Sequence, residues 1–219
     1  MGAPQVIRGA LPAALCARWL AAIAPHAGRS LALSQHPGLH AAEVLQAVAA
    51  SALAAPARQA LEPPLLCNLD QSWIRHGRPP HSWHQDGALG FDFMAHEHRD
   101  LPEGALLPMQ TCWIALTPCG ADAPGLEWVN APTPQLLRPS ELIDTAVQQR
   151  FAAQGFERPI LQPGDAVVFD GSLLHRTHLR PAMTATRTSL ELRYFRADAF
   201  QRQGGPADKA WRTASTAAS

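Results

Sequence analysis

Residues 163–175 read PGDAVVFDGSLLH, and this stretch decides the fold. Pro163 and Gly164 are typical of a tight turn, and residues 165–170 that follow are rich in branched and aromatic side chains, as strands are. His175 comes shortly after the point where such a strand would end. The pattern predicts a strand whose far end leaves a histidine near the edge of a sheet.

Three further stretches carry the same strand signals and are bounded by proline, glycine or charged residues. They are residues 65–74 (LLCNLDQSWI), 109–116 (MQTCWIAL) and 188–195 (TSLELRYF). Because these strands do not alternate with crossover helices, the order argues against a parallel doubly wound sheet. It favours an antiparallel sandwich or barrel with helices packed outside.

Helical signals lie mainly before the strands. Apolar residues recur at helical spacing over residues 11–24 and 39–53, and a third helix is expected between Ser140 and Gly155. We therefore expect one domain, mainly β with flanking α-helices. Residues 1–60 would form a helical flank, residues 65–197 the β core and residues 200–219 a flexible tail.

Length and charge narrow the class of protein. A chain of 219 residues fits one domain, and its 18 Lys and Arg balance 18 Asp and Glu. This balance argues against nucleic acid or an anionic membrane as a partner. The four cysteines form no CxxC pair, and no apolar run reaches the roughly 18 to 20 residues of a membrane span. We expect a cytoplasmic protein that is a monomer or a small homo-oligomer.

The segment SWHQDG at residues 82–87 carries the chemistry. In a strand, residues i and i+2 share a face, so His84 and Asp86 can present a nitrogen and an oxygen to one point. With His175 they would form a 2-His-1-carboxylate triad, which holds non-haem Fe(II) and leaves coordination positions open. The carboxylate argues against a closed structural zinc site.

Arg187 lies twelve residues beyond His175 and opens the last strand. If that strand pairs with the one before His175, the guanidinium would come close to the metal. Its rigid fork suits the distal carboxylate of an oxo acid.

Four stretches in this order resemble the phytanoyl-CoA dioxygenase-like family of Fe(II)/2-oxoglutarate oxygenases. They are WHQDG at 83–87, CWIAL at 112–116, PGDAVVFDGSLLH at 163–175 and RTSLELRYF at 187–195. The resemblance implies a double-stranded β-helix, the jelly roll of cupin-like proteins, with iron at one mouth. It also implies Fe(II), 2-oxoglutarate as co-substrate and O2, with succinate and CO2 released as a small-molecule substrate is hydroxylated.

Individual roles follow from this resemblance. The iron ligands would be His84, Asp86 and His175, and Arg187 would bind the distal carboxylate of 2-oxoglutarate. The remaining expected positions are Thr111, Gln71 and Thr177 near the co-substrate or substrate, and Phe169 in the pocket wall. Aromatic character and loop position add Phe91 and Trp128 as substrate contacts.

Two departures from the family pattern affect these roles. The interval from His175 to Arg187 is one residue longer than expected, so Arg193, at the same parity on the strand, is the alternative anchor. The turn that relatives carry after the middle strand is replaced by PGLEWVNAP at 124–132. We therefore look for substrate specificity in residues 91–108 and 119–139, and interpret residues 96–98 (HEH) as part of a solvated loop.

Two other classes of protein compete with an oxygenase. A non-oxidative cupin-type metalloprotein, either an isomerase or a metal-dependent binding module, could use the same triad but would not need Arg187. A catalytically inactive binding domain would not need an intact triad. Retention of Asp86 also argues against the related halogenases, in which a small residue replaces the acid.

Overall fold

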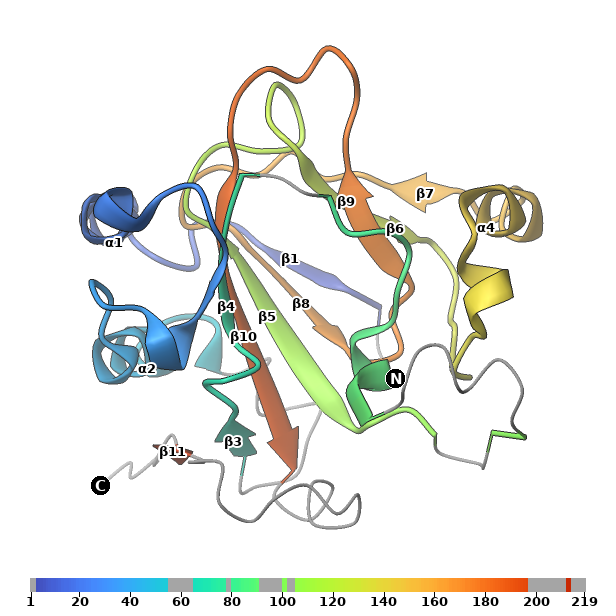
Figure 1. The fold of residues 1–219 in the computed structure, drawn as a ribbon, viewed down its shortest axis with the longest axis horizontal. Helices are drawn as coiled ribbons and strands as arrows, with labels where there is room; N and C mark the ends of the chain where they lie inside the picture. Colours follow the sequence, from blue (N-terminus) through green and yellow to red (C-terminus); the bar gives the residue numbers. More distant parts are fainter. Residues whose placement is uncertain are drawn as a thin grey trace.

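The computed structural model describes residues 3–54, 65–77, 80–90, 100–101, 105–196 and 212–213. Two antiparallel sheets form the body, with helices on their outer sides (Figure 1). The larger sheet has the order β1 (Gln5–Ile7), β8 (Ala166–Asp170), β5 (Met109–Ala115), β10 (Thr188–Arg196), β3 (Leu65–Cys67) and β11 (Arg212–Thr213). Strand β4 (Trp73–His76) also pairs with β10, and β2 (Leu31–Ala32) pairs with β4. The smaller sheet has the order β7 (Phe156–Glu157), β6 (Gly125–Val129) and β9 (His175–His178).

The expected fold class is confirmed, since the described residues are mainly β and every strand pair is antiparallel. The first two expected helices are α1 (Ala13–Ile23) and α2 (Ala41–Ala49). The third is divided into a 3-10 turn, η5 (Pro139–Leu142), and α4 (Asp144–Arg150), because Ile143 between them has extended backbone angles. Within the described ranges, no helix has both the length and the apolar character needed to cross a membrane.

The core has two layers because side chains alternate across β5. Cys112 and Ile114 point to the outer layer with Trp19 and Val44, so α1 and α2 cover this face of the larger sheet. Trp113, between Cys112 and Ile114, belongs to the inner layer between the two sheets. The inner layer is therefore the one that can border a site enclosed by the sheets.

The prediction of a single strand over residues 65–74 is wrong. The segment forms β3 and β4, separated by a turn in which Asn68 Oδ1 accepts hydrogen bonds from the backbone N–H groups of Asp70 (3.0 Å) and Gln71 (3.2 Å). An asparagine side chain that bonds to the backbone two or three residues later is a common turn device. Both strands still pair with β10.

Strand β6 was not anticipated, because it lies in a segment with prolines on both sides, Pro124 and Pro132, and proline is uncommon in strands. Its five residues are all buried, and it is the central strand of the smaller sheet. The interior even includes a charged group, Glu127, whose carboxylate pairs with Arg158 and Arg176. The expected tail is described only at Arg212–Thr213, which form β11, and residues 200–211 and 214–219 lie outside the described residues.

Asp165 ties β1 to the turn before β8. Its carboxylate accepts hydrogen bonds from the backbone N–H of Gly9 (2.8 Å) and Gln162 (2.9 Å), and it pairs with Arg8 (2.7 Å). Burial alone would raise the pKa of Asp165, but these donors outweigh burial and hold the pKa below its usual value. The ionised carboxylate therefore favours the folded state.

We expect Asp165→Asn to lower the free energy of unfolding by about 1–3 kcal/mol near neutral pH, because it weakens charge-assisted hydrogen bonds. Because the pKa of Asp165 is lower in the folded than in the unfolded protein, its ionised carboxylate stabilises the folded state at pH values above the unfolded pKa of about 4. This stabilisation is lost as the pH falls through the folded-state pKa. The difference between variant and wild type should therefore shrink towards about pH 3. Urea unfolding at both pH values measures it, and an equal difference at both would contradict the assignment.

Candidate metal centre and co-substrate cavity

His84 and His175 are neighbours although they are far apart in the sequence. They form an isolated antiparallel bridge, with backbone hydrogen bonds of 2.9 Å from His84 N to His175 O and 3.0 Å in return. The expectation that His84 and Asp86 share a strand face is wrong, because His84 lies at this single bridge and Asp86 begins the 3-10 turn η3 (Asp86–Gly90). Their side chains nevertheless converge, and one ligand atom from each of the three residues lies within 4.8 Å of the others.

The two histidines have the tautomer that metal binding requires. Nδ1 of His84 lies 2.7 Å from the carbonyl oxygen of Ser82, and Nδ1 of His175 lies 3.0 Å from that of Leu173. A carbonyl only accepts, so each Nδ1 carries the proton and each Nε2 keeps a lone pair for a cation. Burial, aided by the neighbouring His175, lowers the pKa of His84 to about 4, so its ring is neutral at physiological pH.

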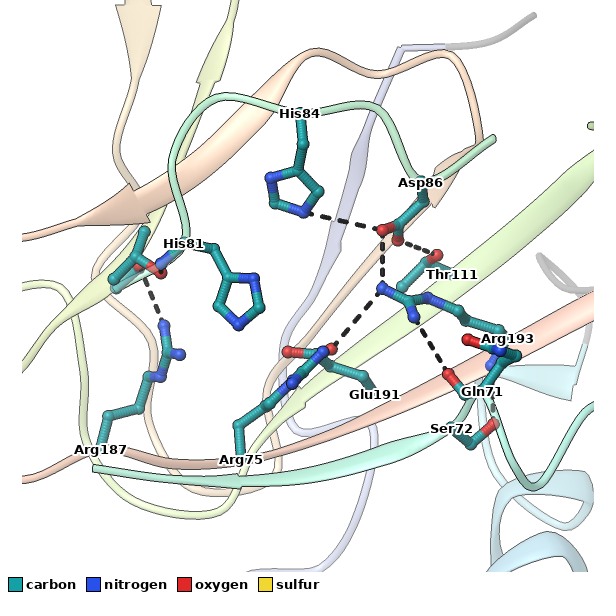
Figure 2. A network of polar contacts seen from close by, with 12 residues as sticks. Gln71, Ser72, Arg75, His81, His84, Asp86, Thr111, Arg187, Glu191 and Arg193 are labelled. Atoms are coloured by element: carbon teal, nitrogen blue, oxygen red, sulfur yellow. Dashed lines mark hydrogen bonds and ion pairs between the residues drawn. The ribbon is translucent and has the colours of Figure 1, made fainter. Parts of the chain in front are cut away.

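Asp86 is buried and has a donor on each carboxylate oxygen. Arg193 Nη2 donates to Oδ1 at 2.7 Å, and Thr111 Oγ1 donates to Oδ2 at 2.6 Å (Figure 2). Burial raises the pKa of Asp86, but Arg193, the two histidines and Thr111 together outweigh it and hold the pKa well below its usual range. Two imidazole nitrogens and one carboxylate are the donor set that suits non-haem Fe(II).

A cavity lined by this triad extends between the two sheets. The triad lines one part of it, and Figure 2 shows Arg187 on the far side of His81 from His84 and Asp86. Arg187, Glu191 and Arg193 all line the cavity because alternate residues of β10 share a face. Arg187 reaches it although β5 separates β10 from β8, so the expected pairing of the last strand with the one before His175 is wrong.

The two candidate anchors for 2-oxoglutarate differ in what already binds their nitrogens. Arg193 donates through Nη2 to Asp86 and through Nη1 to the carbonyl of Gln71 (3.1 Å). Arg187 is 3% exposed, and its Nη1 makes one long hydrogen bond of 3.3 Å to Gly125 O. The Nε atoms of both arginines have no partner in the described part of the chain, so the difference lies in the terminal nitrogens. Arg187 is therefore the guanidinium with more donors to spare for a ligand.

The other expected positions fall in different places. Thr111, Phe169 and Thr177 line the cavity, and the Phe169 ring packs edge-on against His175 at 4.8 Å between centroids. The Gln71 side chain is not in the cavity wall, since this residue contributes its backbone carbonyl to Arg193 instead. Trp128 is 4% exposed and belongs to the inner core layer. It lines neither this cavity nor the cleft beside it. Phe91 and residues 96–98 lie outside the described residues.

Several residues of the cavity wall were not anticipated from the sequence. They include the polar residues Arg75, His81 and Glu191. Arg75 donates to Glu191 (3.1 Å), whose carboxylate lies 3.9 Å from Arg193. The parity of 187, 191 and 193 on one strand could have identified Glu191, but the division of residues 65–74 into two strands hid Arg75.

A second cleft lies beside the first, and Phe169 lines both. Its walls include residues 129–133, Leu173 and the N-terminal residues Ala3 and Pro4. Polar groups at its rim come from Asn130, Thr133, Asp170 and Ser172. Part of the segment in which we expected substrate specificity, residues 119–139, thus borders a cleft next to the triad.

This β fold, with two histidines and one aspartate converging beside a cationic cavity, defines the class of facial-triad oxygenases. The model of the phytanoyl-CoA dioxygenase family matches residues 5–180. The chain belongs to this family and is an Fe(II)- and 2-oxoglutarate-dependent oxygenase. A comparison with curated protein sequences gives no match.

Solved structures support the same fold. EctD from S. alaskensis with 2-oxoglutarate and 5-hydroxyectoine has a TM-score of 0.63 and 18% identity, covering 90% of this chain and 73% of that one. The epimerase SnoN from nogalamycin biosynthesis has a TM-score of 0.57 and 17% identity, covering 96% and 86%. HygX from Streptomyces hygroscopicus with nickel and 2-oxoglutarate has a TM-score of 0.56 and 14% identity, covering 89% and 83%. The expected jelly-roll fold is confirmed.

Proposed function

We propose that the protein hydroxylates a small-molecule substrate, with decarboxylation of 2-oxoglutarate to succinate and CO2. His84, Asp86 and His175 would hold Fe(II), and Arg187 would bind the distal carboxylate of 2-oxoglutarate. One observation carries this proposal. A converging triad opens into the same cavity as Arg187, a buried guanidinium whose hydrogen bonds among the described residues are limited to one long bond from Nη1.

The chain's own residues would position the co-substrate. The Cζ atom of Arg187 lies 5.6 Å from the centre of the Trp113 ring, within the range of a cation–π contact. Thr177 Oγ1 accepts a hydrogen bond from the backbone N–H of His81 at 3.0 Å, which leaves its own proton free to donate. The Thr177 hydroxyl is thus available to the same carboxylate as Arg187. The bound iron, together with 2-oxoglutarate, supplies the activation of O2.

Arg187 also favours an oxygenase over a non-oxidative cupin-type metalloprotein. Keeping a guanidinium 3% exposed with an unpaired nitrogen costs free energy unless a ligand completes its hydrogen bonds. An isomerase or binding module that uses only the triad has no need of this cation. A dicarboxylate co-substrate does, because one carboxylate can bind the metal while the other binds Arg187.

The cleft beside Phe169 is the place we propose for the substrate. Asn130 is exposed at its rim, so a larger side chain there can narrow the cleft without disturbing the core. We expect Asn130→Trp to raise the KM for the substrate about tenfold or more, or to uncouple succinate from product, while the affinity for 2-oxoglutarate stays within about threefold. Asn130→Ala is the matched control. An unchanged KM together with equal coupling in Asn130→Trp and wild type would place the substrate elsewhere.

The reaction itself can be tested with a pool of small metabolites, Fe(II), 2-oxoglutarate and isotopically labelled O2. We expect one component to stimulate succinate formation and to gain one labelled oxygen atom. A product that forms with succinate but gains no oxygen would contradict hydroxylation and leave the oxygenase assignment intact. The same assay identifies the substrate needed for the Asn130 variants.

A further inference from the structure

A line of buried charges of alternating sign runs from the metal site along the face of β10. Asp86 pairs with Arg193 at 2.7 Å, Arg193 lies 3.9 Å from Glu191, and Glu191 pairs with Arg75 at 3.1 Å (Figure 2). Asp86, Arg193 and Glu191 are all buried, at 3%, 5% and 9% exposed. Such groups are seldom buried unless each has a partner, so the line is a single connected unit.

Arg193 is held on three sides. Nη1 donates to the Gln71 carbonyl at 3.1 Å, Nη2 donates to Asp86, and the backbone N–H of Arg193 donates to the Ser72 hydroxyl at 3.1 Å. Two terminal nitrogens fixed to different acceptors set the plane of the guanidinium. A lysine ammonium could supply the charge but could not reproduce this fork.

The contacts at Asp86 determine how its carboxylate is oriented. Arg193 binds one oxygen and Thr111 the other, so the carboxylate cannot rotate without breaking a hydrogen bond. Each oxygen accepts one hydrogen bond and keeps further lone-pair capacity for a cation. Arg193 and Thr111 therefore orient the Asp86 carboxylate and leave lone pairs on its oxygens for a metal.

We propose that Arg193 is a positioning residue that fixes the Asp86 carboxylate for metal binding, with Gln71 and Glu191 holding the guanidinium in place. The inference rests on the metal site proposed above. Arg193 acts through Asp86, and its role is separate from that of Arg187, which would contact 2-oxoglutarate. Positioning also differs from a purely electrostatic role of Arg193, because the two roles predict opposite changes in metal affinity when Arg193 is replaced.

Removal of Arg193 would change metal affinity in opposite directions under the two roles. A nearby cation repels a divalent metal, so an arginine that acted only through its charge would weaken metal binding, and its removal would tighten it. A hydrogen-bond partner that orients a ligand strengthens metal binding, and its loss typically weakens affinity about 10- to 100-fold. Metal affinity therefore distinguishes the two roles without any turnover assay.

The test is a titration of metal-free protein with Co²⁺ in the absence of 2-oxoglutarate. Calorimetry measures the affinity, and the visible absorption of Co²⁺ reports its coordination. We expect Arg193→Gln to weaken Co²⁺ binding about 10-fold or more and to change the Co²⁺ spectrum, because the freed carboxylate adopts other orientations. Arg193→Lys should recover only a small part of the affinity. Unchanged or tighter binding by Arg193→Gln, or full recovery by Arg193→Lys, would overturn the proposal.

Matched variants keep the test decisive. Arg150→Gln makes the same change on α4, outside both the line of charges and the cavity wall, and its Co²⁺ affinity should stay within about twofold of wild type. Thr111→Val removes the other donor to Asp86 with little change in shape. It should weaken Co²⁺ binding about threefold or more, and it carries the test if Arg193→Gln does not fold. Wild-type affinity in Thr111→Val would then overturn the proposal.

Failure of the metal site itself would look different. If wild type did not bind Co²⁺, or bound it as tightly as His175→Ala does, the proposed metal site would be wrong. If wild type binds Co²⁺, His175→Ala does not, and Arg193→Gln matches wild type, the site stands and only the role of Arg193 falls.

Discussion

Asp86→Ala is expected to abolish succinate formation from 2-oxoglutarate, and His84→Ala and His175→Ala should do the same. Each change removes one of the three ligand atoms that lie within 4.8 Å of one another. Asp86→Asn is the more informative replacement, because it keeps the shape of the side chain and removes the charge. Succinate release with iron in excess measures the loss, and full succinate production in Asp86→Ala would contradict the triad.

The two histidine variants should remain folded, which separates loss of the metal from loss of the protein. His84 and His175 lie at an isolated bridge beside the cavity and belong to none of the apolar clusters. We expect the melting temperatures of His84→Ala and His175→Ala to stay within a few degrees of wild type. Glu43→Gln, which changes an exposed carboxylate on α2, is the control and should keep succinate production.

Arg187→Ala is expected to weaken 2-oxoglutarate binding about 30-fold or more. Loss of one partner of a buried, hydrogen-bonded ion pair costs about 2 to 5 kcal/mol, and about 2 kcal/mol corresponds to a 30-fold change. Lysine should rescue the affinity only in part, because a point charge lacks the fork of a guanidinium.

The measurement is a 2-oxoglutarate titration at saturating metal, with Arg193→Ala beside Arg187→Ala. Saturating metal removes the effect that Arg193 is proposed to exert through Asp86. Wild-type affinity in Arg187→Ala, together with a large loss in Arg193→Ala, would show that Arg193 is the anchor.

The features that could be predicted from the sequence are those that short, local residue patterns determine. A histidine, one spacer and an aspartate can converge whether they lie in a strand or at a bridge, so His84 and Asp86 were found although their local structure was not. Strong strand composition located β5, β8 and β10, and apolar spacing located α1 and α2. The position of Arg187 beside the cavity followed from the family resemblance, although the strand pairing behind the argument was wrong.

Other features depend on pairing over long distances. β6 is short and lies among prolines, and it becomes a strand because β7 and β9 pair on both its sides. Trp128 looked like a substrate contact because an aromatic residue in a loop often is one, but as part of β6 it packs in the inner core. Arg75 enters the cavity only because β4 pairs with β10, and nothing in the local sequence encodes that register.

Anaerobic addition of Fe(II) and 2-oxoglutarate to the purified protein tests the central claim most directly. We predict a weak visible charge-transfer band that forms in wild type and is absent in His175→Ala, followed by succinate when O2 is admitted. A protein that binds Fe(II) but gives neither the band with 2-oxoglutarate nor succinate with O2 would contradict the account.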